Sequence, residues 1–454
     1  MILKYSLVSL IILLFVTASD PFFGIDLSWK KPPSEESADV VEHLWLRTDV
    51  FKPYLLDYDD RVSNLFPVDD YFYPNVLFWF LIYTQFESNS VVIHDKADLS
   101  IIYKVLDFSS LHKKELPRNT IYVLQDKIAE DKVEELKRDL EELSMDPYSL
   151  STTSRNILRA LKQAGITLPT SKSDRSIFFT ELKKNLRTQT GQKNFIKSGI
   201  VESLPYQSFL FRLFADKKLP KELLAIPFLE SSFNPRAHSK VSAAGAWQFM
   251  PLISSYFLPK RTTNLDYRFN IGLSSLAAAK LLDENHRILK SWDLAVTAYN
   301  SGTKHLLKTK RELNRSDVTL EDVIKHSDSK HFGFASKNFY SEFLALVHTL
   351  AYQEELFDGL HTHDRKDVNE ELRYFMAKCS VKLEKILKAE VLDDIYFHNH
   401  QLKKSTHTLP RGYLITSKSL LPSNRFYHVP YKELLRTKPK DWGRFLRGQS
   451  CSTR

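Results

Sequence analysis

The most regular pattern of apolar and polar positions in this chain lies between residues 128 and 143. Ile128, Val133, Leu136, Leu140 and Leu143 recur there three to five residues apart among Glu, Lys and Asp. This spacing gathers apolar side chains on one face of a helix and charges on the other. It predicts an amphipathic surface helix whose run of charges faces solvent.

Upstream of this helix the pattern is shorter and mixed. Residues 76–84 are apolar and aromatic, whereas residues 90–94 and 99–105 are rich in β-branched and apolar side chains. Short runs of this kind are typical of buried strands or helices packed on a sheet. They predict a small α or α+β accessory region over residues 19–173.

Residues 174–357 form the most helical part of the chain. Apolar positions recur with a period near 3.6, and turns are marked at Pro205, Pro220, residues 234–235 and Gly302. Beyond residue 358 the composition shifts toward Lys, His and Thr. A helical stretch at 381–389, followed by residues 396–399 and 409–415, predicts a small C-terminal module over 358–454. The fold class expected is therefore mainly α.

The N-terminus has the features of a secretory signal. Lys4 precedes an apolar run from Leu7 to Val16, and Val16 and Ala18 have the small-residue spacing of a cleavage site. The run is short for a transmembrane helix, which needs about 20 apolar residues. We expect a signal peptide at 1–18, with an uncleaved anchor as the alternative. The protein should be exported to the periplasm or cell envelope of a bacterium, or secreted.

The composition of the chain limits the classes of binding partner that we expect. The 454 residues are 43% hydrophobic, enough for two or three domains, and carry a formal charge of +9. This charge suits an acidic cell wall or a membrane surface, or serves solubility alone. Export disfavours nucleic acid. The two cysteines, Cys379 and Cys451, permit one disulfide without requiring it, and the lack of clustered Cys and His predicts no metal.

The candidate chemistry begins at Glu230. This carboxylate ends an apolar run, Leu-Leu-Ala-Ile-Pro-Phe-Leu-Glu, that starts at Leu223. Desolvation there would raise its pKa and suit a general acid near neutral pH. The alternative is a glutamate at a helix end that simply faces solvent.

Later segments supply groups that bind sugars. Residues 245–251 read Gly-Ala-Trp-Gln-Phe-Met-Pro and residues 298–302 read Ala-Tyr-Asn-Ser-Gly. Aromatic rings stack on sugar faces, and amides pair with hydroxyl and acetamido groups. Trp247 and Phe249 could instead be core residues, and we expect one of the two to be core.

Other acidic and histidine residues are better explained without catalysis. His94 with Asp95 invites a triad interpretation, but no serine lies in a strand-turn-helix elbow. Four carboxylates between the motifs are expected to be helix caps or exposed charges: Asp266, Asp283, Glu284 and Asp293.

Four motifs in order over about 120 residues resemble those of the lytic transglycosylases, most closely the membrane-bound type D branch. They are the run from Leu219 to Pro235, the segments 245–251 and 298–302, and Phe-Gly-Phe-Ala-Ser-Lys-Asn-Phe-Tyr ending at Tyr340. The upstream segments Arg-Thr-Gln-Thr-Gly-Gln-Lys from Arg187 and Ile-His-Asp at 93–95 look similar to the same branch.

The resemblance implies a goose-lysozyme-like helical domain that cleaves the β-1,4 bond between MurNAc and GlcNAc in peptidoglycan glycan strands, without a cofactor, and leaves 1,6-anhydroMurNAc ends. Glu230 would be the acid/base, and the substrate-binding set would be Ser231, Gln248, Tyr299, Asn300 and Tyr340. Within that set Ser231 would help orient Glu230, and Tyr340 would donate a hydrogen bond to it. One departure is Ala246, where the family pattern has Leu; it predicts a packing adjustment.

Two alternatives remain. A lysozyme-type muramidase would use water on the same scaffold, and a non-catalytic wall-binding protein would need no acid, although Glu230 is present. The C-terminal region also bears a faint likeness to peptidoglycan-binding modules, carried by Asn399 and residues 409–415. It is expected to be a degenerate wall-binding or packing segment.

Overall fold

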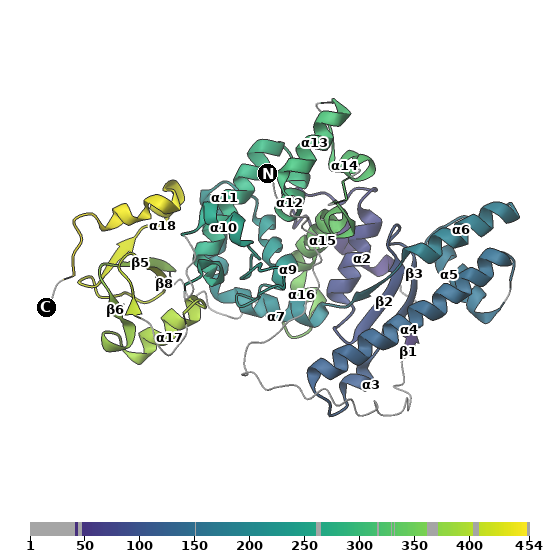
Figure 1. Ribbon diagram of the computed structural model, residues 1–454, viewed down its shortest axis with the longest axis horizontal. Coiled ribbons are helices and arrows are strands. Elements are labelled where there is room, and N and C mark those ends of the chain that lie inside the picture. Colours follow the sequence, from purple (N-terminus) through teal and green to yellow (C-terminus); the bar gives the residue numbers. More distant parts are fainter. Residues whose placement is uncertain are drawn as a thin grey trace, which may run out of the picture.

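The computed structural model describes residues 41–43 (backbone only), 48–149, 151–259, 265–315, 317–327, 329–330, 332–360, 371–402 and 408–451. The expected signal segment, 1–18, lies outside these residues. Three units lie in a row in Figure 1: a sheet with long helices on the right, a helical domain in the middle and a small C-terminal module on the left. No helix in the described ranges combines the length and the apolar character needed to span a bilayer.

The N-terminal unit is built on a four-stranded antiparallel sheet with strand order β1-β3-β2-β4. Its elements are β1 (Val41–His43), η1 (Asp49–Phe51), α1 (Lys52–Leu55), α2 (Tyr73–Thr84), β2 (Ser90–Asp95), β3 (Ile102–Asp107), α3 (Ser109–His112), α4 (Arg118–Met145), α5 (Thr152–Gln163), α6 (Lys172–Asn185) and β4 (Leu186–Thr190). The segments 90–94 and 99–105, which the sequence left open between strand and helix, form β2 and most of β3.

The two faces of this sheet pack against different partners, because alternate residues of a strand point to opposite sides. Val91 and Ile93 join the core formed with α4, α5 and α6, whereas Val92 joins the core that includes α2. The amphipathic helix expected at 128–143 is confirmed within α4, where Leu136, Leu140 and Leu143 are buried. The sheet therefore has α4 to α6 on one face and α2 on the other.

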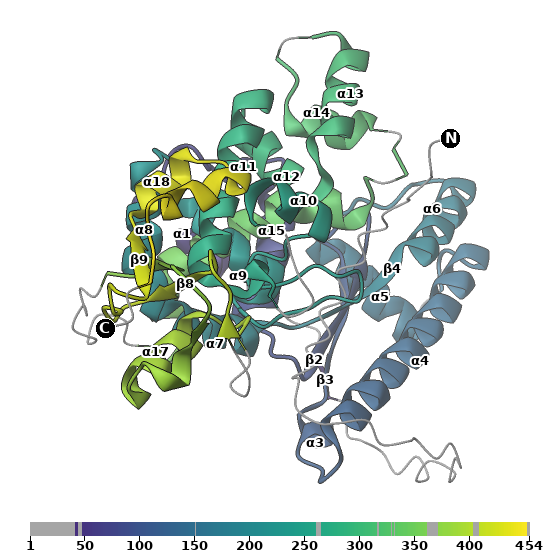
Figure 2. The same cartoon turned by 60° about the vertical axis from the view of Figure 1, so that its left-hand side comes forward.

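The central domain is helical. Its elements are α7 (Lys193–Ser203), η2 (Leu204–Tyr206), α8 (Gln207–Asp216), η3 (Lys221–Ala225), α9 (Ile226–Ser231), α10 (Pro251–Phe257), η4 (Tyr267–Phe269), α11 (Ile271–Leu289), α12 (Trp292–Ser301), α13 (Thr303–Leu313), α14 (Leu320–His326), α15 (Phe334–Ala351) and α16 (Gln353–Leu356). Helix α15 packs against α2, α12, α9 and η3, so it connects the helical domain to the N-terminal unit. Figure 2 shows α13 and α14 projecting above this domain. The expected mainly α fold is confirmed.

The boundary expected at residue 174 falls inside α6. Helix α6 packs on α4, and β4 pairs with β2 of the N-terminal sheet. Both elements thus belong structurally to the N-terminal unit, and the helical domain begins with α7.

The C-terminal module contains β5 (Arg373–Ala377), β6 (Val381–Lys382), η5 (Leu383–Lys385), α17 (Ala389–His398), β7 (Thr408–Leu409), β8 (Leu414–Ser417), β9 (Phe426–Val429), α18 (Tyr431–Arg436) and η6 (Pro439–Leu446). Its main sheet has the order β8-β5-β9, and β6 pairs with β7. A disulfide joins Cys379 to Cys451, which settles the pairing that the sequence left open.

The prediction of a helix at 381–389 is wrong. Val381 and Leu383 are buried while Lys382 and Glu384 are exposed, an alternation that suits a strand rather than a helix. Val381 and Lys382 form β6, a turn of 3₁₀ helix follows, and α17 begins only at Ala389.

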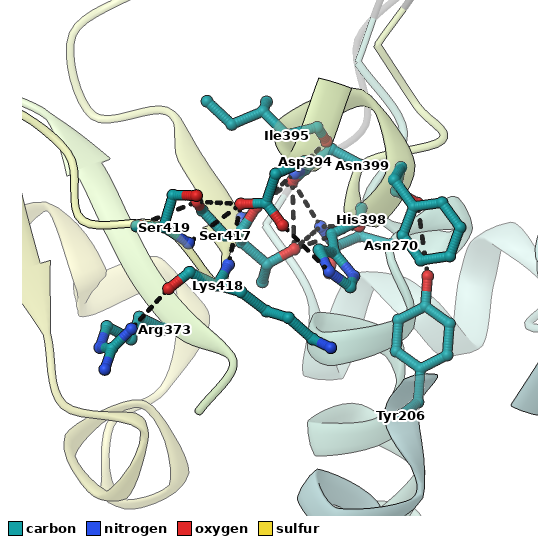
Figure 3. Close-up of polar contacts among 12 residues, drawn as sticks. Tyr206, Asn270, Arg373, Asp394, Ile395, His398, Asn399, Ser417, Lys418 and Ser419 are labelled. Atoms are coloured by element: carbon teal, nitrogen blue, oxygen red, sulfur yellow. Dashed lines mark hydrogen bonds and ion pairs between the residues drawn. The ribbon is translucent and has the colours of Figure 1, made fainter. Parts of the chain in front are cut away.

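A buried polar network joins this module to the helical domain (Figure 3). The side-chain amide of Asn270 donates to Asn399 Oδ1 at 2.7 Å and to Thr416 Oγ1 at 3.0 Å, and the backbone N–H of Thr416 donates to the same Asn399 oxygen at 2.9 Å. All three residues are fully buried. Since buried polar groups are costly when unpaired, this network fixes the docked position.

Candidate active site

Glu230 lies in the last turn of α9, a helix only six residues long. The helix stops because Ser232 and Phe233 adopt left-handed backbone conformations, with φ of 50° and 58°. This sharp turn packs closely on α7, where a Cβ on Gly199 would lie 2.2 Å from the carbonyl oxygen of Ser232. Glycine at 199 therefore allows the turn that ends α9 beside the acid.

The Glu230 carboxyl is mostly enclosed by protein. Burial raises its pKa to about 8, and the negative charge of Glu342 adds to the rise. A carboxyl with this pKa holds its proton at neutral pH and can donate it.

Glu342 is a second carboxylate beside the site, which the sequence analysis missed. It lies on α15, and burial raises its pKa to about 8 against the opposing effects of the Tyr83 hydroxyl and the Arg187 charge. Tyr83, on α2, donates to Glu342 Oε2 at 3.4 Å. The available signal was a lone charge in the otherwise apolar or uncharged stretch 338–347.

The loop of residues 245–249 is held by its carbonyl groups. Ser231 Oγ donates to Ala246 O at 2.9 Å, Tyr299 Oη to Trp247 O at 2.8 Å, and Arg268 Nη1 to Phe249 O at 2.7 Å. These three donors come from three different elements, so the loop has little freedom to shift relative to Glu230.

Gln248 is the partly exposed member of this loop. Its backbone is left-handed, with φ of 45°, and its side-chain amide donates to Gly245 O at 2.7 Å. Trp247 and Phe249 are both core residues, exposed by 0% and 2%, whereas the sequence led us to expect only one. The Trp247 indole N–H donates to Ser275 Oγ at 2.8 Å, which satisfies its polar atom inside the core.

The structure gathers most of the expected site residues. Tyr299 is held by its hydrogen bond to Trp247 O, and burial and then the charge of Glu230 raise its pKa. Asn300 accepts a hydrogen bond from Ser336 Oγ at 2.9 Å, which ties α12 to the start of α15. Ser231 is only 1% exposed, so it can position the loop but offers almost no surface to a ligand.

The Tyr340 ring lies against other aromatic side chains. Its ring contacts Phe72 and Phe343 with centroid distances of 5.3 Å and 6.0 Å. Burial raises its pKa, and the charges that act on it are those of Asp293 and Asp69. The structure thus packs the Tyr340 ring between α15 and the start of α2, and among the described contacts none is a hydrogen bond from Tyr340 to Glu230.

Arg268 is a further residue that the sequence analysis did not single out. It is 2% exposed, forms a bidentate pair with Asp266, and donates to Ser242 O at 2.6 Å as well as to the 245–249 loop. The cap expected at Asp266 is confirmed, since its side chain accepts from the Arg268 N–H at the start of η4.

His94 and Asp95 do not form a catalytic pair. The His94 Nδ1–H donates to the carbonyl oxygen of Asp95 at 2.9 Å, and burial lowers the pKa of His94 to about 4. The ring is therefore neutral. In the part of the chain that the structure describes, no three His, Cys, Asp or Glu side chains converge in a way that could hold a metal.

Comparison with known proteins concerns the middle of the chain. Residues 213–319 match the family model described as the Transglycosylase SLT domain. Two curated relatives, each called membrane-bound lytic murein transglycosylase D, come from Escherichia coli K12 and Escherichia coli O6:H1. Each is 31% identical over 117 residues, which is 26% of this chain and 26% of the relative. The chain thus spans about a quarter of the length of these relatives. The matched family segment includes Glu230 but not Glu342.

Proposed function

We propose, from the match of residues 213–319 to the Transglycosylase SLT domain, that this protein is a lytic transglycosylase that cleaves the β-1,4 bond between MurNAc and GlcNAc in peptidoglycan. The observation that carries the proposal is Glu230, a mostly buried carboxyl whose pKa is raised to about 8 by burial and by Glu342. Such a group is protonated at neutral pH and suits acid catalysis at a glycosidic oxygen.

The proposed reaction uses one carboxyl twice. Glu230 donates its proton to the glycosidic oxygen as the bond to the MurNAc anomeric carbon breaks, assisted by the acetamido group of that sugar. As a carboxylate, Glu230 then accepts the proton of the C6 hydroxyl while this oxygen bonds to the anomeric carbon. No water is consumed, and the product is a 1,6-anhydro ring. Gln248, the partly exposed residue of the 245–249 loop, is the proposed ligand for the acetamido group.

A second candidate is a muramidase that releases reducing ends, and Glu342 favours it. Glycosidases that hydrolyse their substrate commonly use a second carboxylate as base or nucleophile. Glu342 is the carboxylate that acts electrostatically on Glu230. However, the Tyr83 hydroxyl already donates a hydrogen bond to Glu342, so we prefer a supporting role for Glu342 and the transglycosylase reaction.

The proposed location is the bacterial envelope, after export by the N-terminal segment. The disulfide between Cys379 and Cys451 supports it, because disulfides persist in oxidising compartments such as the periplasm.

Digestion of purified sacculi tests the function. The wild-type protein should release muropeptides with 1,6-anhydro ends, which are lighter by one water than hydrolysed products in mass spectrometry. The Glu230→Gln variant should fold normally and lose about 100-fold to 10,000-fold in rate, the usual contribution of a positioned acid/base.

Two results would overturn these assignments separately. Reducing MurNAc ends as the main product would replace the transglycosylase with the muramidase. Near wild-type digestion by the folded Glu230→Gln variant would remove Glu230 from the chemistry.

A further inference from the structure

Arg187 is a partly buried guanidinium whose use the proposed reaction does not explain. It lies on β4, the last strand of the N-terminal sheet. Among the described residues the structure records no hydrogen bond or ion pair from its side chain, and its Nε atom is buried without a partner. A buried N–H left without an acceptor is unfavourable, which suggests that a ligand completes the site.

The strand register aims Arg187 toward the helical domain. Arg187 pairs with His94 of β2, and directly opposite residues of antiparallel strands share a face of the sheet. That face is the one covered by α2, as the packing of Val92 shows. The guanidinium carbon lies 4.3 Å from the centroid of the Phe334 ring, so the first turn of α15 orients it.

The groups around Arg187 leave its charge uncompensated near neutral pH. His94 is neutral there because burial lowers its pKa to about 4. Glu342 attracts Arg187, but burial raises the pKa of Glu342 to about 8, so this carboxyl also tends to hold its proton. Glu342 in turn acts on Glu230, so Arg187 is linked electrostatically to the acid through Glu342.

We propose that Arg187, presented by β4 over Phe334, binds a carboxylate of the glycan-strand substrate. This inference rests on the proposed function for the identity of the strand. MurNAc can offer a carboxylate on its stem peptide, or on its own lactyl group once the peptide is removed, whereas GlcNAc offers none. A planar guanidinium suits a carboxylate because it can form two parallel hydrogen bonds. The N-terminal unit would then contribute to substrate specificity, because Arg187 would favour binding of MurNAc and its carboxylate-bearing substituent over GlcNAc.

Binding measurements with three ligands test this role without depending on turnover. The Glu230→Gln protein, with and without Arg187→Gln, is titrated calorimetrically with peptide-bearing strands, with strands stripped of peptide, and with GlcNAc oligomers. Loss of a charge-assisted pair should weaken binding of the recognised strand by about 10-fold to 100-fold. Binding of GlcNAc oligomers should change by less than about twofold.

The pattern identifies the source of the carboxylate. Loss confined to peptide-bearing strands assigns it to the stem peptide, and loss confined to stripped strands assigns it to the lactyl group. Arg187→Lys keeps the charge but loses the planar guanidinium that forms two parallel hydrogen bonds. Its affinity for the recognised strand should lie between those of the arginine and glutamine proteins. Equal weakening for all three ligands, or none for any, would overturn the proposal.

A matched control is Arg175→Gln on α6. The Arg175 guanidinium also lies over a ring, 4.6 Å from the centroid of Tyr148, but it donates to Pro169 O at 2.6 Å within the N-terminal unit. This variant should bind all three ligands as the parent does. Failure of sacculus digestion by the wild-type protein would reject the proposed function, whereas the ligand pattern judges Arg187 alone.

Discussion

At the scale of single residues, the protonation of Glu230 gives the most direct test. Its pKa is raised to about 8, and the acid form is the one that starts the reaction. Activity should therefore persist through neutral pH and fall about tenfold per pH unit above 8 as the proton is lost. A pH-rate profile on soluble glycan strands measures this limb. A rate that already falls from pH 5 would mean an ordinary, solvated carboxyl.

Glu342 should help to determine the pH above which the rate begins to fall. Glu342→Gln removes the negative charge that, after burial, raises the Glu230 pKa, so the fall in rate should move to lower pH. The same pH-rate profile measures the change. Asp283→Asn is the control, because Asp283 pairs with Lys217 on the surface at 2.9 Å.

An unmoved limb in the Glu342→Gln variant would remove the electrostatic role. A different outcome, in which anhydro products give way to reducing ends or turnover stops at every pH, would assign Glu342 a part in the chemistry itself.

Whether the sequence predicted a site residue depended on how far along the chain its contact partners lie. Glu230, Gln248 and Tyr299 lie in local motifs, and their motif order places them in one region. Arg268 and Glu342 were missed because their roles come from partners distant in the chain, such as Phe249 and Tyr83. The proposed hydrogen bond from Tyr340 to Glu230 stays a prediction, because the ring contacts of Tyr340 with Phe72 and Phe343 do not test it.

At the scale of elements, the segment 266–270 links the C-terminal module to the 245–249 loop. Tyr267 stacks on Tyr413 of the module at a centroid distance of 4.9 Å, and its hydroxyl accepts the Leu414 N–H at 3.1 Å. The adjacent Arg268 holds the loop carbonyl of Phe249. Because these contacts are continuous, the docked module supports the geometry around Gln248.

Asn399 tests this support. Asn399→Ala would leave the buried N–H of Thr416 without its acceptor, at a cost of about 1–3 kcal/mol, while the Asn270 amide would keep its bonds to Thr416 Oγ1 and His398 O. Hydrogen exchange should show faster opening of β8 and α17, and turnover of soluble strands should fall. The exposed Glu390→Ala on α17 is the control.

Unchanged exchange in the Asn399→Ala variant would show that the network does not hold the module. Faster exchange with unchanged turnover would separate docking from the support of the loop. Asn399 is also one of the residues that gave the region its likeness to a wall-binding module, and its burial in the joint leaves it no surface for a glycan.

Secondary-structure elements could be predicted from the sequence where their apolar and polar residues alternate with a clear period. Helix α4 was predictable because it has a polar face and an apolar face over 28 residues. Helix α2 has no such contrast, since it is buried between the sheet and α15 and most of its side chains are apolar. The stretch 381–389 misled because a two-residue strand and a 3₁₀ turn are too short to leave a periodic pattern.

At the scale of the whole molecule, the helical domain is held from two sides. Helix α2 of the N-terminal unit packs on α15, and Asn270 at the start of α11 receives the C-terminal module. The three units in Figure 1 therefore meet at helices that carry or adjoin the site. This arrangement could not be read from the sequence, because it depends on single polar contacts between segments more than 100 residues apart.

The disulfide gives the last prediction. Cys379 follows β5 and Cys451 lies beyond η6, so the bond closes a segment of 72 residues that contains the rest of the module. A cross-link of this span stabilises the folded state mainly by limiting the conformations of the unfolded chain, typically by about 2–4 kcal/mol.

Reductant should therefore lower the melting temperature of the module in the wild-type protein but not in the Cys379→Ser/Cys451→Ser variant. Tryptophan fluorescence of Trp442, which is buried in η6, would follow the module once a Trp442→Phe protein defines the background. Equal melting with and without reductant in the wild type, with the bond verified by mass spectrometry, would mean that packing and the Asn270 network already hold the module in place.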